Sequence, residues 1–200
     1  MKHGSLVLFA LFGAAGLAHA GLIDITEQAT ASGVLNGTHF TNALVTLDFE
    51  GDTSFLSVAP THVSLNGAGA VTVAGVGSDI FTDTIQAYSN PTTGSVGMWD
   101  VGVSEVMLET DNVSLIGYGM TTSIGPVVGS AFLSGQSYTT SGGSFRITAI
   151  TVIDDQQDST LTATVSPTDS APEPGSFLLA AAGIAALMLR RKKLSLSEDC

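Results

Sequence analysis

The 200-residue chain has very few basic residues, and this lack already excludes several functions. Six Lys and Arg stand against 18 Asp and Glu. Five of the six bases lie near the two ends, so residues 21–171 hold fifteen carboxylates and one base, Arg146, for a formal charge of −14. Proteins that bind nucleic acid neutralise phosphates with Lys and Arg. We therefore expect no nucleic-acid partner and no phosphorylated substrate.

Cysteine is nearly absent, and aromatic residues make up only 6% of the chain. Cys200 is the one cysteine, so no disulfide can form within the chain. The hydrophobic content of 44% is too high for a chain that stays unfolded for lack of apolar residues. A body of about 150 residues is long enough to bury a single core without disulfides.

Helical periodicity is also lacking between residues 21 and 171, where short runs of alternating apolar and polar residues occur instead. Val45, Leu47 and Phe49 alternate with polar residues and predict a half-buried strand. The other predicted strands are 71–76, 99–103, 113–118, 145–152 and 161–165. Predicted turns lie at 36–37, 51–52, 66–67, 90–91, 142–143 and 154–155. This pattern predicts an all-β antiparallel sandwich, jelly roll or barrel.

The first twenty residues have the three parts of a secretory signal peptide. Lys2 opens a short basic region, residues 6–17 form an apolar run, and Ala18 and Ala20 form a small-x-small cleavage site. We therefore expect signal peptidase to remove residues 1–20 and the rest of the chain to be exported.

The C-terminal end carries a second targeting pattern. Pro172, Glu173 and Pro174 separate it from the body, because proline ends a preceding helix. The apolar run at 175–189 predicts a transmembrane helix of about 22 Å, which is short for a bilayer core of about 30 Å. A basic cluster follows this run and is expected to stay on the cytoplasmic side. It consists of Arg190, Arg191, Lys192 and Lys193.

This order of Pro-Glu-Pro, short apolar helix and basic cluster resembles the PEP-CTERM protein-sorting signal of Gram-negative bacteria. The same signature is also known as an ice-binding protein C-terminal domain, but it describes the tail and gives no evidence that the body binds ice. The resemblance implies transient anchoring in the inner membrane and cleavage near Pro172–Pro174 by an exosortase-type transpeptidase. It further implies a final location in the cell envelope, at the cell surface or in the secreted extracellular matrix. The additional residues Leu194–Cys200 depart from the pattern.

The predicted organisation has five parts. They are a signal peptide at 1–20, a β-rich extracytoplasmic domain at 21–165, a linker with the Pro-Glu-Pro motif at 166–174, a transmembrane helix at 175–189 and a basic cytoplasmic tail at 190–200.

Motifs that would indicate catalysis are scarce. His39 and His62 are the only histidines between residues 21 and 171, neither belongs to a metal-binding pair, and we expect both on the surface or in loops. The chain has no G-x-S-x-G nucleophile elbow and no glycine-rich phosphate loop before a helix. We therefore predict that the protein is not an enzyme and holds no cofactor. Two carboxylates that cleave a glycoside remain an alternative, because their pairing in space is not visible in a sequence.

Two acidic segments, Asp48–Asp52 and Asp154–Asp158, are candidate calcium sites, because hard cations bind several oxygens on a loop. The first departs from the EF-hand pattern, since Thr53 stands where glycine belongs and Ala59 where glutamate belongs. We expect a solvated strand end and an acidic turn with no bound metal, and calcium binding stays an alternative.

These features favour an exported, non-enzymatic protein that is structural or interactive in the envelope or in an exopolysaccharide biofilm matrix, with exopolysaccharide as the candidate partner. The alternative is a carbohydrate- or calcium-binding β-sandwich adhesion module. A line of exposed aromatic residues across one sheet face would favour that module. A secreted hydrolase would instead need two carboxyl groups about 5–10 Å apart in a cleft.

Overall fold

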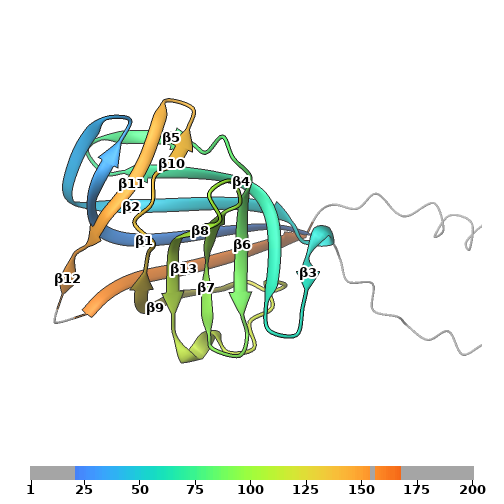
Figure 1. Cartoon of the computed structure of the whole chain (residues 1–200). Helices are drawn as coiled ribbons and strands as arrows, with labels where there is room; N and C mark the ends of the chain where they lie inside the picture. The colour runs from blue at the N-terminus through green and yellow to red at the C-terminus, as the bar shows by residue number, and fades with distance from the viewer. Residues whose placement is uncertain (1–20, 154–155, 168–200) are drawn as a thin grey trace, which may run out of the picture. The chain divides into compact units, whose positions relative to one another are not determined.

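The structure, a computed structural model, describes residues 21–153 and 156–167, and these form strands with two short 3₁₀ helices (Figure 1). The strands are β1 (Gly21–Leu35), β2 (Thr38–Asp52), β3 (Ser57–Val58), β4 (Val63–Val73), β5 (Gly77–Ile80), β6 (Ile85–Asn90), β7 (Ser95–Asp100), β8 (Glu105–Asp111), β9 (Ile124–Phe132), β10 (Tyr138–Thr140), β11 (Gly143–Ile150), β12 (Val152–Ile153) and β13 (Gln156–Pro167). The 3₁₀ helices are Thr53–Phe55 and Val113–Leu115. The predicted all-β class is confirmed.

Eight of these strands close into an antiparallel barrel. Its order is β1-β2-β4-β6-β7-β8-β9-β13, and β13 pairs again with the first part of β1. Gly21 lies opposite Pro167 in that pairing, so the first and last residues of the segment that forms the barrel are adjacent. Of the three all-β architectures that the sequence left open, the structure selects the barrel, whose closure leaves no unpaired edge among these eight strands.

Strand β1 belongs to two pairings. Its first part, Gly21–Ala29, pairs with β13, and its second part, Ala31–Leu35, pairs with β11. The register shifts at Gly33, where a Cβ atom would lie 2.0 Å from the Arg146 carbonyl oxygen. Glycine therefore allows β11 to approach β1 closely at this irregularity, which follows the change of partner between Ala29 and Ala31.

The β10–β11 hairpin packs beside β5 (Figure 1). The Ser141 amide donates a hydrogen bond of 2.9 Å to the Ile80 carbonyl. Asp79 of β5 accepts hydrogen bonds from the Gly142 amide at 2.7 Å and from Asn36 Nδ2 at 2.6 Å. One carboxylate thus connects the turns of two hairpins, including the predicted turn at 36–37.

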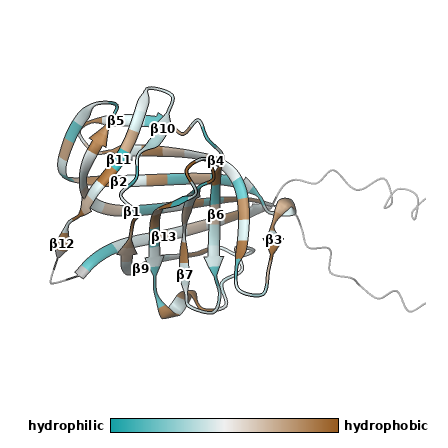
Figure 2. Ribbon diagram, viewed as in Figure 1, coloured by the Kyte–Doolittle hydropathy of each residue, from teal (hydrophilic) through white to brown (hydrophobic). Residues whose placement is uncertain are grey.

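The core lies inside the barrel, because alternate residues of each strand point inward. Val45, Leu47 and Phe49 are buried as predicted, and hydrophilic and hydrophobic bands alternate along the strands in Figure 2. Strand β1 contributes Ile23, Ile25, Ala29 and Ala31 to the core. Its polar inward residue, Glu27, is fully buried.

One predicted strand, 113–118, is absent, and another, 99–103, is shorter than predicted. Residues 113–118 begin with a 3₁₀ helix instead of a strand, because the Asn112 side chain accepts a hydrogen bond of 2.7 Å from the Ser114 amide and caps that helix. The predicted strand 99–103 ends at Asp100. Asp100 Oδ1 accepts from the amides of Gly102 at 2.7 Å and Val103 at 3.2 Å, which folds the following residues into a turn.

Two further expectations are corrected around β4. Residues 74–76 form a turn after β4 rather than the end of a strand, with the Val76 amide donating to the Val73 carbonyl at 3.0 Å. The predicted turn at 66–67 lies within β4. Gly67 occurs there because a Cβ atom would lie 2.1 Å from the Glu50 carbonyl and 2.7 Å from the Phe49 ring.

No helix in residues 21–153 or 156–167 has the length and apolar character that crossing a membrane requires. The predicted helix at 175–189 lies outside the described residues. The same holds for the signal peptide, the linker beyond residue 167 and the basic tail.

Candidate functional site

The outer face of β6, β7 and β8 brings together aromatic and polar side chains from three strands. Ala87, Met98 and Leu108 point inward and are buried. The side chains that point outward beside them are Gln86, Tyr88, Trp99 and Glu109. In the register of these strands, Gln86 lies opposite Trp99, and Trp99 lies opposite Val106. The only tryptophan of the chain is therefore half-buried on the outer surface.

Gly97 makes room for a contact between β6 and β8. It lies between Tyr88 and Glu109 in the register, and a Cβ atom there would lie 2.9 Å from Tyr88 Oη. Because Gly97 has no side chain, Tyr88 Oη reaches across β7 and donates a hydrogen bond to Glu109 Oε2. This hydrogen bond fixes the position of the carboxylate beside Trp99.

These side chains line a surface hollow of about 320 Å³, which we call the aromatic groove. Its lining residues are His62, Gln86, Tyr88, Trp99, Val106 and Glu109.

Glu109, the carboxyl group of the aromatic groove, has a raised pKa. Partial burial raises the pKa of Glu109 above its usual value, the hydrogen bond from Tyr88 lowers it, and the negative charge of Asp111 raises it further. Burial and the neighbouring Glu109 raise the pKa of Tyr88, so the phenol remains a hydrogen-bond donor at neutral pH. Glu109 can accept additional hydrogen bonds from a ligand, because the bond from Tyr88 occupies only one lone pair of the Glu109 carboxylate.

The aromatic groove has no Lys or Arg among its lining residues. Arg146 is the one Lys or Arg of the described residues; its Nε donates a hydrogen bond of 2.8 Å to the Gly135 carbonyl, and it does not line this groove. A site with one carboxylate and no fixed cation is unsuited to phosphate or sulfate. It suits an uncharged ligand that carries hydroxyl groups and an apolar face.

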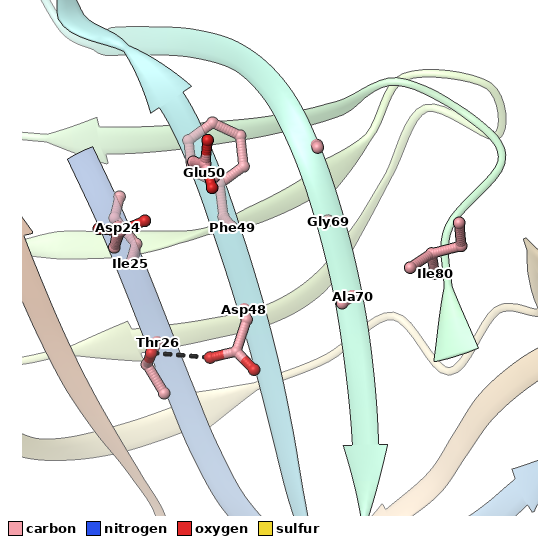
Figure 3. Close-up of a pocket in the computed structure, with 10 residues that line it drawn as sticks. Asp24, Ile25, Thr26, Asp48, Phe49, Glu50, Gly69, Ala70 and Ile80 are labelled. Atoms are coloured by element: carbon pink, nitrogen blue, oxygen red, sulfur yellow. Dashed lines mark hydrogen bonds between the residues drawn. The ribbon is translucent and has the colours of Figure 1, made fainter. Parts of the chain in front are cut away.

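A second hollow of about 370 Å³, which we call the acidic groove, lies on the outer face of β1, β2 and β4 (Figure 3). Asp24 of β1 lies opposite Glu50 of β2, and Thr26 Oγ1 donates a hydrogen bond of 2.8 Å to Asp48 Oδ1. The remaining wall is apolar and comes from Ala68, Ala70 and Ile80, among others.

The structure does not gather the acidic segment Asp48–Asp52 into a calcium site. Asp48 and Glu50 are alternate residues of an extended strand, and such residues are about 6.8 Å apart along the strand. Asp52 accepts a hydrogen bond of 2.8 Å from the Ser54 amide, which lowers its pKa. Among the described residues no three His, Cys, Asp or Glu side chains are placed to hold a metal ion. Asp154 and Asp155 of the other segment lie outside those residues.

Glu27 is a buried carboxyl group inside the barrel that the sequence did not suggest. Its Oε1 accepts a hydrogen bond of 2.9 Å from Thr110 Oγ1, which also lies 2.7 Å from Ser159 Oγ. Glu27 Oε2 has no hydrogen-bond partner within the described part of the chain. Burial raises the pKa of Glu27 well above its usual value, although the Thr110 hydrogen bond lowers it.

The structure describes only some of the site residues that were predicted from the sequence. His39 and His62 are exposed, as expected, and His62 also lines the aromatic groove. The signal cleavage residues Ala18 and Ala20, the Pro172–Pro174 motif and the basic cluster Arg190–Lys193 lie outside the described residues.

The sequence reasoning missed the contact between Tyr88 and Glu109, which are 21 residues apart. Trp99 was assigned correctly to a strand, but its neighbours depend on pairings that one sequence does not reveal. Gly97, a glycine inside an alternating run, was the available signal of a close approach.

One comparison with known proteins gives a match. Residues 170–192 match the family model of the PEP-CTERM protein-sorting motif. The matched segment contains Pro172–Pro174 and three of the four bases at 190–193, so the resemblance found from the sequence is confirmed. Neither the curated proteins nor the solved structures gave a match to the chain.

Proposed function

We propose that this protein is a non-enzymatic component of the extracellular matrix that binds exopolysaccharide through the aromatic groove. The sorting motif at residues 170–192 supports export and processing by an exosortase-type enzyme. The observation that carries the proposal is the placement of Trp99, Tyr88 and Glu109 around one surface hollow.

The chemistry of the aromatic groove fits a sugar. A pyranose ring has an apolar face of C–H groups that can stack on an aromatic side chain, and its hydroxyl groups bond carboxylates and amides at the rim. Trp99 and Tyr88 supply the aromatic surface, while Glu109 and Gln86 supply polar partners. A closed barrel does not require these residue types at outward positions, so their grouping is best explained by a ligand.

A glycan array tests the binding proposal with the full chain, purified in a detergent that has no sugar head group. Neutral polysaccharides should retain the protein, whereas uronic-acid polymers should not, because residues 21–171 carry a net charge of −14. Retention by uronic-acid polymers alone would contradict the proposal, as would the absence of any retained glycan.

The non-enzymatic part of the proposal has its own test. Incubation of the bound polysaccharides with the protein should release no new reducing ends over many hours. Steady release that Glu109→Gln abolishes would instead make Glu109 the acid of a hydrolase.

Mass spectrometry of the protein recovered from the producing cells tests the processing. We expect the mature chain to begin at Gly21 and to end near Pro172–Pro174. A protein recovered at the cell surface with residues 175–200 still attached would contradict cleavage at the sorting motif.

A further inference from the structure

Another hollow, distinct from the acidic groove, adjoins the aromatic groove on the same outer face, and we call it the second hollow. It has a volume of about 460 Å³ and is lined by Phe55, Ser57, Ser64, Asn66 and Gln86. Gln86 lines both hollows. The two therefore meet at this side chain.

The strand register aligns the two hollows across the sheet. Ser57 lies opposite Ser64, Ser64 opposite Tyr88, and Tyr88 opposite Gly97. Gly97 in turn lies opposite Glu109. This row crosses from β3 to β8 in four strand-to-strand steps, which is roughly 19 Å at about 4.8 Å per step.

A parallel row of side chains links the hollows by a hydrogen bond. Asn66 lies opposite Gln86, and Gln86 lies opposite Trp99. Gln86 Nε2 donates a hydrogen bond of 2.9 Å to Asn66 Oδ1. That bond leaves Gln86 Oε1 and Asn66 Nδ2 to accept and donate hydrogen bonds to a ligand.

Aromatic side chains lie in both hollows. Trp99 lines the aromatic groove, and Phe55 of the first 3₁₀ helix lines the second hollow with 75% of its surface exposed. A phenylalanine so exposed contributes little to the core, but it offers an apolar surface on which a further sugar ring could stack. None of the residues that line either hollow is Lys or Arg.

We propose that the two hollows form one extended groove that binds several consecutive units inside a neutral polysaccharide chain. This inference rests on the proposed sugar-binding function and specifies its ligand. Because the row spans five strands, it is roughly 19 Å long. This length is greater than that of one pyranose ring. The ligand is uncharged because both hollows lack a fixed cation and the surrounding body is acidic.

Calorimetry with oligosaccharides of different length tests this inference on the full chain in a sugar-free detergent. The probes are the disaccharides and hexasaccharides of β-1,4-linked glucose and of β-1,4-linked N-acetylglucosamine. In the series that binds, the hexasaccharide should bind about tenfold more tightly than the disaccharide, because it reaches both hollows.

Variants assign the gain to the second hollow. Phe55→Ala and Asn66→Ala should each lower the hexasaccharide affinity toward that of the disaccharide. Phe55→Ala, at a residue that does not line the aromatic groove, should also leave disaccharide binding unchanged. Val58→Ala is the matched control, because Val58 is 77% exposed on β3 and does not line the hollow. Thermal unfolding of each variant shows whether the barrel is intact.

The outcomes separate the two proposals. Equal affinity for the disaccharide and the hexasaccharide, or a length gain that persists in both Phe55→Ala and Asn66→Ala, overturns the extended groove and leaves sugar binding at Trp99 in place. If neither series binds at either length, the proposed sugar-binding function itself is overturned.

Discussion

The acidic and aromatic grooves are hollows of similar size on one barrel, about 370 and 320 Å³, with opposite chemistry. The acidic groove combines Asp24, Asp48 and Glu50 with small apolar residues such as Ala70 (Figure 3). The aromatic groove holds Trp99, and its one carboxylate, Glu109, is bonded by Tyr88.

This difference separates what the fold requires from what a ligand requires. The barrel needs apolar residues at inward positions, and both regions supply them. Outward positions are free to vary, and carboxylates there keep the exported body soluble. Tyr88 is partly buried and bonds Glu109 across β7, whereas the half-buried Trp99 lies outside the core, so the proposed sugar ligand accounts for Trp99 better than the fold does.

Removal of the indole should have the largest effect on binding. Trp99→Ala should weaken binding of a neutral hexasaccharide by about five- to tenfold, because aromatic stacking contributes about 1–1.5 kcal/mol. Ile80→Ala is the matched change in the acidic groove, where Ile80 is 60% exposed, and it should leave the affinity unchanged. Calorimetry on both variants measures the contrast, and equal losses would remove the distinction between the grooves.

Glu27 allows a change inside the barrel that should affect stability and leave binding alone. Because burial raises its pKa well above the usual value, the folded state favours the protonated carboxyl. The stabilisation from this group is complete below about pH 4.5 and is lost as the pH rises through the raised pKa.

Glu27→Gln should therefore raise the free energy of unfolding at pH 8 by about 1 kcal/mol or more and change it little at pH 4. Urea unfolding at the two pH values measures this, and sugar affinity should stay the same. A variant that is less stable at pH 8 would show that the ionised carboxylate is needed for the fold.

Glu109 should make sugar binding depend on pH. Its raised pKa means that the carboxylate, the stronger hydrogen-bond acceptor, is lost at a higher pH than for an ordinary glutamate. We expect affinity to fall by about threefold as the pH is lowered from 7.5 to 5.

Two variants assign this dependence. Glu109→Gln should bind with little variation over that range, whereas the control His62→Gln, at another polar side chain of the groove, should keep the fall. A pH dependence that disappears with His62 would assign it to the imidazole instead.

The smallest effect is expected in the acidic groove. Asp24→Asn combined with Glu50→Gln should leave hexasaccharide affinity unchanged and raise stability by less than about 1 kcal/mol, because like charges opposite each other on paired strands repel. The same calorimetry and urea unfolding apply. A clear loss of affinity would show that the sugar also contacts this side of the barrel.

Sequence patterning predicted much of the inner face. Val45, Leu47 and Phe49 alternate cleanly, and they are buried in β2 as expected. Strand β1 was missed because Glu27 interrupts its inward series, and a buried carboxyl group held by Thr110 is not expected from alternation alone.

The candidate site was less accessible to prediction for a physical reason. Alternation tells which residues share a face, but the pairing of strands decides which of them touch. Tyr88 and Glu109 meet only because β6, β7 and β8 pair in one register and Gly97 leaves the space between them. The sorting motif, by contrast, is read from contiguous residues and needed no tertiary information.

Tryptophan fluorescence tests the central claim most directly, because Trp99 is the only tryptophan in the chain and lines the proposed groove. Titration of the full chain with the neutral hexasaccharide that binds in calorimetry should shift the emission, with half of the shift reached at the Kd that calorimetry gives. Binding that leaves the emission unchanged would place the sugar elsewhere and contradict the account.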